Sequence, residues 1–178
     1  RYFLSSLHDF DLEKDAIAYD DLLALDKWAI GKAHEAQEKI QQHYEKYEFH
    51  LVVQTIHHFC AVDMGAFYLD IIKDRQYTMA KDSLGRRSAQ TALHHIVHAL
   101  VRWVAPILCF TADEIFEHLN GEQVESVFMA TWYEGLTPLE TNAIDWKKIS
   151  VVREAVNKEI ERLRADKVLG SALEADVT

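Results

Sequence analysis

Glycine, proline and cysteine are all scarce in this chain. Its 178 residues include 6 Gly, 2 Pro and 2 Cys. A β-sandwich or β-barrel needs turn residues at short intervals, so the scarcity of Gly and Pro argues against both and favours long uninterrupted helices. The two cysteines, Cys60 and Cys109, lack the C-x-x-C spacing of a zinc or redox site. We therefore expect free buried thiols in a reducing compartment.

Targeting and membrane-spanning segments are missing as well. The sequence opens without a signal peptide, and it contains no apolar run long enough to cross a bilayer. We expect a cytoplasmic protein that acts as a monomer. The chain opens at Arg1 without an initiator Met, and "RYFLSSL" is typical of the last turns of a helix, so we also expect a piece of a longer protein.

Positive charge gathers in one stretch of an otherwise acidic chain. The formal net charge of −10 argues against a free-standing nucleic-acid-binding module, which is usually basic. Between Lys73 and Arg87, however, five basic residues stand against two acidic ones. Such a stretch can bind a phosphate backbone or form an ordinary solvated loop, and the charge count alone leaves both interpretations open.

Hydrophobic periodicity predicts an all-α protein, a helical bundle of four to five helices. Apolar residues recur every three or four positions over long stretches. The expected helices cover residues 20–47, 50–73, 82 or 83 to 106, 112–119 and 142–166. We expect a bundle over 1–141, followed over 142–178 by a C-terminal helix and the start of a further region.

Local signals refine the fourth of these helices and the segment that follows it. Thr111 and Glu114 have the spacing of a capping box, which predicts a helix start there, and Asn120-Gly121 predicts its end. Trp132 and Tyr133 are expected to anchor the irregular segment after that helix against the core.

Catalytic and metal-binding patterns are weak. His94 and His98 share a helix face, but a di-metal site in a bundle needs Glu-x-x-His pairs, and this sequence contains none. "IGKAH" (30–34) lacks the glycine-rich cradle of a phosphate-binding loop. "TMAKDS" (78–83) only faintly resembles Lys-Met-Ser-Lys-Ser. We expect neither a metal site nor catalytic residues in this chain.

Several stretches resemble one family along nearly the whole chain. "ALVRWVAPILCFTADEIFEHL" (99–119) resembles the motif L-x-R-x-x-A-P-x-x-x-F-T-A-E-E-x-W in the anticodon-binding bundle of class I aminoacyl-tRNA synthetases for isoleucine, valine, leucine and methionine. "FYLDIIKDRQYT" (67–78) is similar to the bacterial-type isoleucyl-tRNA synthetases. The same holds, in the order of that family, for "LDKWAIGKAHEAQEKI", "SLGRRSAQTALHHI", "FMATWYEGL" and "RADKVLGSALEADV".

The resemblance implies that the chain recognises the anticodon stem-loop of tRNA-Ile as part of an isoleucine–tRNA ligase. Other domains would perform the ATP-dependent charging and the editing, because the signatures His-Ile-Gly-His and Lys-Met-Ser-Lys-Ser are absent here. ATP, Mg and the zinc of a C-terminal module would bind outside this chain. Candidate tRNA-binding residues are Lys73, Arg75, Gln76, Tyr77, Lys81, Arg86, Arg87, Gln90, Arg102 and Trp103.

Structural roles compete with RNA contact at these positions. Arg75 can pair with Asp70 or Asp74 to hold a helix end, and Trp103 can be a core residue. Arg86 and Arg87 lie near a helix start, where the helix dipole disfavours positive charge, and a phosphate partner would offset that cost. Three other functions stay open: a helical protein-interaction module, a metal-dependent bundle oxidase, and the equivalent domain of a valyl- or leucyl-tRNA synthetase.

Overall fold

The computed structural model describes residues 1–121, 125–139 and 144–176, and these form two compact units, Arg1–Leu139 and Glu140–Thr178. Helices and turns make up the described residues, with no strand among them, which confirms the all-α prediction. The expected division between residues 141 and 142 lies outside the described residues.

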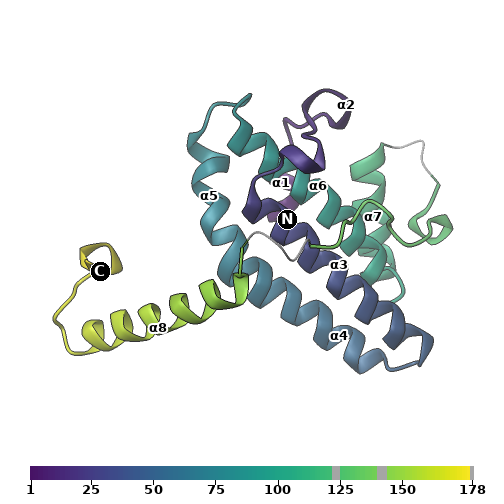
Figure 1. The fold of residues 1–178 in the computed structure, drawn as a ribbon. Coiled ribbons are helices and arrows are strands. Elements are labelled where there is room, and N and C mark those ends of the chain that lie inside the picture. The colour runs from purple at the N-terminus through teal and green to yellow at the C-terminus, as the bar shows by residue number, and fades with distance from the viewer. Residues whose placement is uncertain (122–124, 140–143, 177–178) are drawn as a thin grey trace. The chain divides into compact units, whose positions relative to one another are not determined.

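Three long helical segments build the core of the first unit (Figure 1). Helix α3 (Ala24–Glu45) packs against both α6 (Leu84–Val104) and α4 (Phe49–His58). Small residues allow the close approach, because Ala29 and Ala33 on α3 and Ala92 on α6 are fully buried. Ser83 accepts a hydrogen bond from the Arg86 amide and so caps α6, which decides between the two starts, 82 and 83, that the sequence left open.

The second predicted helix is longer than expected and irregular at its centre. Helix α4 continues without a break into a π-helix, η2 (Phe59–Tyr68), and then into α5 (Leu69–Thr78). Buried residues are spaced five apart from Phe59 to Met64 and four apart from there to Tyr68 and Ile72. A five-residue step is too long for an α-helical turn of 3.6 residues, and the π-helix accommodates it.

The N-terminal residues lie against α6. Two short helices, α1 (Tyr2–Ser6) and α2 (Leu12–Asp15), contact α6, and the turn η1 (Tyr19–Asp21) leads into α3. Two amides hold this segment in place: Ile17 N–H donates to the Thr91 hydroxyl over 3.1 Å, and Leu23 N–H donates to the Ser88 hydroxyl over 3.0 Å.

The predicted capping box at Thr111 and Glu114 is wrong. Helix α7 (Cys109–Asn120) begins earlier, so Thr111 lies inside it. After Pro106 the chain turns at once into the next helix, because Leu108 N–H donates to the Val104 carbonyl and the Leu108 carbonyl accepts from Ala112 N–H. The predicted end is confirmed at Gly121, whose φ of 90° suits a residue without a side chain.

Residues 125–139 return across the bundle from the end of α7. Asp113 of α7 accepts hydrogen bonds from the Ser126 hydroxyl and the Val127 amide and so fixes the turn η3 (Val127–Met129). Further along, a Cβ on Gly31 of α3 would lie 2.6 Å from the Cβ of Leu139. Gly31 is therefore required for the close approach of this segment to α3.

The second unit consists of α8 (Trp146–Ala165) and the turn η4 (Ala172–Glu174). Asp145 caps α8 by accepting from the Lys148 amide over 3.1 Å. The predicted start of this helix at 142 lies outside the described residues. Among the residues that the structure describes, no helix is long and apolar enough to span a membrane.

Candidate nucleic-acid interface

Asp26 is the buried centre of a network that joins α3, η2, α5 and α6. Its fully buried carboxylate accepts from the Tyr68 hydroxyl over 2.7 Å, the Ser88 hydroxyl over 2.6 Å and Arg75 Nη1 over 3.1 Å. Burial raises the pKa of Asp26, against the opposing effect of these three donors. The structural role that the sequence offered Arg75 as an alternative to RNA contact is filled by an ion pair with Asp26 of α3.

Arg86 and Arg87 connect α6 to the N-terminal segment. Arg86 donates to the Asp9 carboxylate over 2.8 Å, and Arg87 forms an ion pair with Asp15 at 3.2 Å. Although burial alone would raise the pKa of Asp9, hydrogen bonds from Gln90 and Arg86 hold it below its usual value. These carboxylates offset the cost of positive charge at the start of α6, where the sequence had suggested a phosphate.

Three more of the candidate residues are buried. Gln76 lies between α5 and α6 and donates to the Arg86 carbonyl, and Gln90 donates to Asp9 and to the Ser6 carbonyl. Trp103 is fully buried, packs edge-on against Phe59 and donates from Nε1 to Gln37 over 3.0 Å. These contacts give each side chain a structural role within the first unit.

Arg102 is separate from the other candidates, near the far end of α6. Its guanidinium lies over the rings of Phe116 and Tyr133, at 5.0 and 5.2 Å, and donates to the carbonyls of Thr131 and His98. Burial lowers the pKa of Arg102 from its usual value. The structure therefore does not bring Arg102 together with Lys73–Arg87.

Lys73, Tyr77 and Lys81 are the candidates that remain exposed, and we call them the α5 corner. Lys73 and Tyr77 are one turn apart on α5, and Lys81 follows in the turn to α6. The Tyr77 ring is 74% exposed, and Lys73 pairs at 2.9 Å with the exposed Asp70 on its own helix. An accessible ring beside flexible ammonium groups can stack on an unpaired base and bind its phosphates.

Tyr2 also belongs beside the α5 corner, and the sequence analysis missed it. Burial raises the pKa of the Tyr2 hydroxyl, the nearby Tyr77 phenol raises it further, and Ser6 and Lys73 partly oppose both effects. Tyr2 therefore lies close to Tyr77 and Lys73, although more than seventy positions separate them in the sequence. The only available signal was an aromatic residue in the first turn of the chain.

Residues 26–178 match the family described as the anticodon-binding domain of tRNA ligase. The chain belongs to this family.

Relatives of this anticodon-binding domain include three isoleucine–tRNA ligases. That of Alkalilimnicola ehrlichii is 51% identical over 181 residues, which cover 99% of this chain and 19% of the relative. That of Dichelobacter nodosus is 52% identical over 180 residues, which cover 99% of this chain and 20% of the relative. That of Pectobacterium carotovorum subsp. carotovorum is 52% identical over 182 residues, covering 100% and 19%. The chain spans about a fifth of the length of these relatives.

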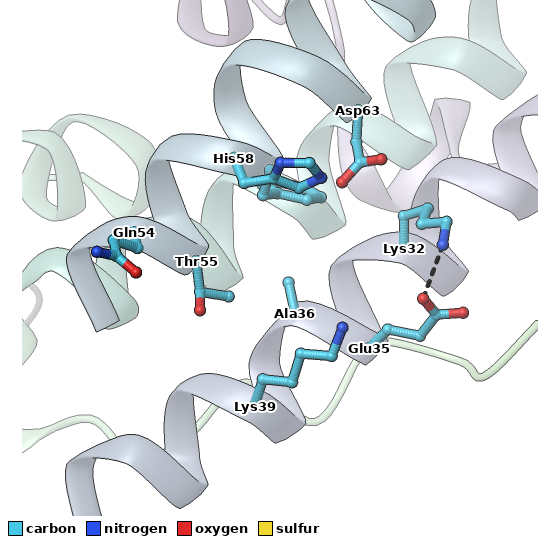
Figure 2. Close-up of a pocket in the computed structure, with 9 residues that line it drawn as sticks. Lys32, Glu35, Ala36, Lys39, Gln54, Thr55, His58 and Asp63 are labelled. Atoms are coloured by element: carbon cyan, nitrogen blue, oxygen red, sulfur yellow. Dashed lines mark hydrogen bonds and ion pairs between the residues drawn. The ribbon is translucent and has the colours of Figure 1, made fainter. Parts of the chain in front are cut away.

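A polar hollow of about 280 Å³ lies further along α3 in the same domain. Figure 2 shows Lys32, Glu35 and Lys39 on α3 across from His58 and Asp63. Lys32 pairs with Glu35 at 2.8 Å, and burial raises the pKa of Asp63. Carboxylates and ammonium groups are mixed here, so the hollow offers no concentrated positive charge to an anion.

The histidines of α6 form a neutral cluster. Burial and the neighbouring imidazole of His95 lower the pKa of His94 to about 4, and burial with nearby positive groups lowers that of His98 to about 3. Their rings lie 4.4 Å apart. Within the described ranges, no three His, Cys, Asp or Glu side chains converge on a point that could hold a metal ion.

We expect acidification to destabilise the domain through this cluster. Unfolded histidines titrate near 6.5, so between about pH 6.5 and 4 the unfolded chain binds more protons than the folded one, and stability falls as the pH falls. A loss of about 3–4 kcal/mol between pH 7 and 5 is expected, measured by urea unfolding. The double variant His94→Gln/His98→Gln should flatten this dependence, and an equally steep loss in that variant would contradict the assignment.

Proposed function

We propose that this chain recognises the anticodon stem-loop of tRNA-Ile as part of an isoleucine–tRNA ligase. The observation that carries the proposal is the match, at about half identity along 99% of the chain, to relatives that are isoleucine–tRNA ligases. The α5 corner supports it, because the corner offers an accessible ring and two lysines at one end of a rigid bundle.

In this proposal the α5 corner makes the contacts with RNA. The Tyr77 ring stacks on an unpaired base of the loop, while Lys73 and Lys81 neutralise phosphates. Arg75 contributes indirectly, because its ion pair with Asp26 fixes α5 against α3. Arg86, Arg87 and Gln90 fix the start of α6 against the N-terminal segment and so set the position of the turn that carries Lys81.

The chemistry of charging would take place elsewhere in the proposed ligase. ATP with Mg would supply the energy for the reaction, and the signatures that hold ATP in the family are absent from this chain. The residues present do not fit an ATP site. Such a ligase would work as a monomer in the cytoplasm, and its zinc module would also lie outside this chain.

The test is tRNA binding by variants of the α5 corner in the whole ligase polypeptide. Tyr77→Ala should weaken binding of tRNA-Ile by about 1 to 3 kcal/mol, the usual loss for one stacked base. Lys73→Gln and Lys81→Gln should each lower the slope of log Kd against log salt by about 0.7. Binding is measured over a series of salt concentrations.

A matched control lies at the other end of α3. Lys46 is exposed, so Lys46→Gln removes the same charge far from the α5 corner. The affinity of this variant for tRNA-Ile should stay unchanged. Equal losses at both ends would remove the α5 corner from the interface. Tighter binding of tRNA-Val or tRNA-Leu than of tRNA-Ile would overturn the isoleucine assignment in favour of the related synthetases.

A further inference from the structure

Large apolar side chains are exposed at the end of the first unit remote from the α5 corner. Helix α3 starts beside Asp26 and Arg75 and reaches Glu45 after 22 residues, so the two ends are about 30 Å apart. The exposed residues come from the α3–α4 turn, the α6–α7 turn and the segment around η3. We call them the apolar end: Tyr47, Phe49, Ile107, Leu108, Phe110, Phe128, Met129 and Trp132.

These side chains belong to one surface. Tyr44 joins two of the segments, because its ring centroid lies 6.1 Å from both Phe49 and Trp132. A hollow of about 300 Å³ continues from Tyr44 and Trp132 to Pro106 and Phe128. Ile107, Leu108 and Phe110 follow Pro106 directly in the chain, and Phe110 is 93% exposed.

Tyr47 has a backbone conformation that tyrosine rarely adopts. Tyr47 follows the last turn of α3 with a φ of 58°, in the left-handed region that glycine or asparagine adopts most readily. A tyrosine in this conformation costs about 1–2 kcal/mol. The structure tolerates the strain and places the ring in contact with Phe49 rather than in the core.

The charges around the apolar end favour a protein partner over RNA. RNA binding needs lysine or arginine for the phosphates. Arg102, which lines the hollow, lies over the rings of Phe116 and Tyr133 and is bonded to backbone carbonyls. His43 is bonded to Glu48 at 2.9 Å. Lys46 is exposed beside Tyr47, but it is flanked by the carboxylates of Glu45 and Glu48, so the surface offers rings and aliphatic groups with little net positive charge.

We infer that the apolar end docks against another domain of the same ligase polypeptide. This inference rests on the proposed function. The chain spans about a fifth of its relatives, so about four fifths of each relative lies outside the matched segment and can supply the covering domain. Monomeric proteins rarely leave a contiguous apolar surface of this kind uncovered, and contacts between domains usually bury about 600–1,500 Å².

Cys109 provides a direct test. The expectation that it is buried is wrong, because its thiol is exposed within the apolar end between Leu108 and Phe110. The rate of alkylation of Cys109 by a maleimide is measured in the 178-residue chain and in the whole ligase polypeptide. We expect the rate to fall at least tenfold in the whole polypeptide. Equal rates in the two would overturn the inference.

Two further measurements separate other occupants from a neighbouring domain. Protection of Cys109 in the 178-residue chain by added tRNA would show that RNA covers the surface and would overturn the inference. Protection that grows with the concentration of this chain would show self-association and would also overturn it. If the whole polypeptide protects Cys109 but does not bind tRNA-Ile, the docking inference stands and the proposed function fails.

A matched pair of variants locates the contact. Phe110→Ser and Leu84→Ser each remove an exposed apolar side chain, the first at the apolar end and the second beside the α5 corner. Both should leave the unfolding of the 178-residue chain unchanged. In the whole polypeptide, Phe110→Ser should increase the alkylation rate of Cys109 at least fivefold and Leu84→Ser should not. Equal rates in these two variants would place the contact elsewhere and contradict the inference.

Discussion

Replacing Asp26 with alanine is expected to lower the free energy of unfolding of the first unit by about 3–5 kcal/mol. The substitution leaves the Arg75 guanidinium without its partner in a largely buried position and removes the acceptor of two hydroxyl groups, those of Tyr68 and Ser88. Unpaired buried charges and donors are among the costliest defects in a protein interior. Urea unfolding followed by tryptophan fluorescence measures the loss.

Asp21→Ala is the matched control for Asp26→Ala. Asp21 is an exposed carboxylate five residues earlier in the chain, so its removal should change stability by less than about 0.5 kcal/mol. Ser88→Ala removes one donor of the Asp26 network, and its loss in free energy of unfolding should lie between those of Asp26→Ala and Asp21→Ala. A loss below about 1 kcal/mol for Asp26→Ala would mean that the network does not hold α3, α5 and α6 together.

Trp103→Ala is expected to cost about 3–5 kcal/mol, the usual range for a large aromatic truncated in a core. The indole is fully buried, packs against Phe59 with centroids 5.3 Å apart and holds the Gln37 side chain, which in turn donates to the Tyr133 carbonyl. Trp103→Phe keeps most of the volume and should cost less. Urea unfolding compares the two variants.

The Trp103 substitution also distinguishes core from RNA contact. Under conditions where Trp103→Phe is fully folded, its affinity for tRNA-Ile should equal that of the unaltered protein. A selective loss of tRNA binding in the folded variant would contradict the core assignment and return Trp103 to the candidate interface. Substitutions of Arg86 and Arg87 would not distinguish a loss of tRNA binding from a loss of folding. Both arginines form ion pairs within the fold, with Asp9 and Asp15.

Periodicity predicted the long helices because their apolar faces are repeated locally in the sequence. Helices α3 and α6, the Ser83 cap and the stop at Gly121 all follow from residues close to one another. The start of α7 was missed because a backbone turn after Pro106 sets it, and the side chains of Thr111 and Glu114 do not. The π-helix was missed because a five-residue step interrupts an otherwise regular pattern.

The candidate site was predictable only in part, since charge alone does not specify a partner. Lys73–Arg87 was recognised as basic, yet Arg75 and Arg86 find acidic partners 49 and 77 positions away in the sequence. Contacts over such separations depend on the packing of α1, α3 and α6, which a single sequence does not encode locally. The structure supplies the ranking, because it leaves Lys73, Tyr77 and Lys81 exposed while Arg75 and Arg86 point to acidic partners.

The π-helix η2 divides the helical segment from Phe49 to Thr78 into two parts. The buried residues before it and after it do not lie on one face of an ideal α-helix. The step of five residues from Phe59 to Met64 acts like an inserted residue, so the face that α5 turns toward α3 is rotated from the one that a continuous α-helix would present. On a single helical wheel, Val52 and Gln76, both buried, would not share a stripe. The wider turns therefore determine which side chains of α5 meet Asp26 and which, like Tyr77, point to solvent.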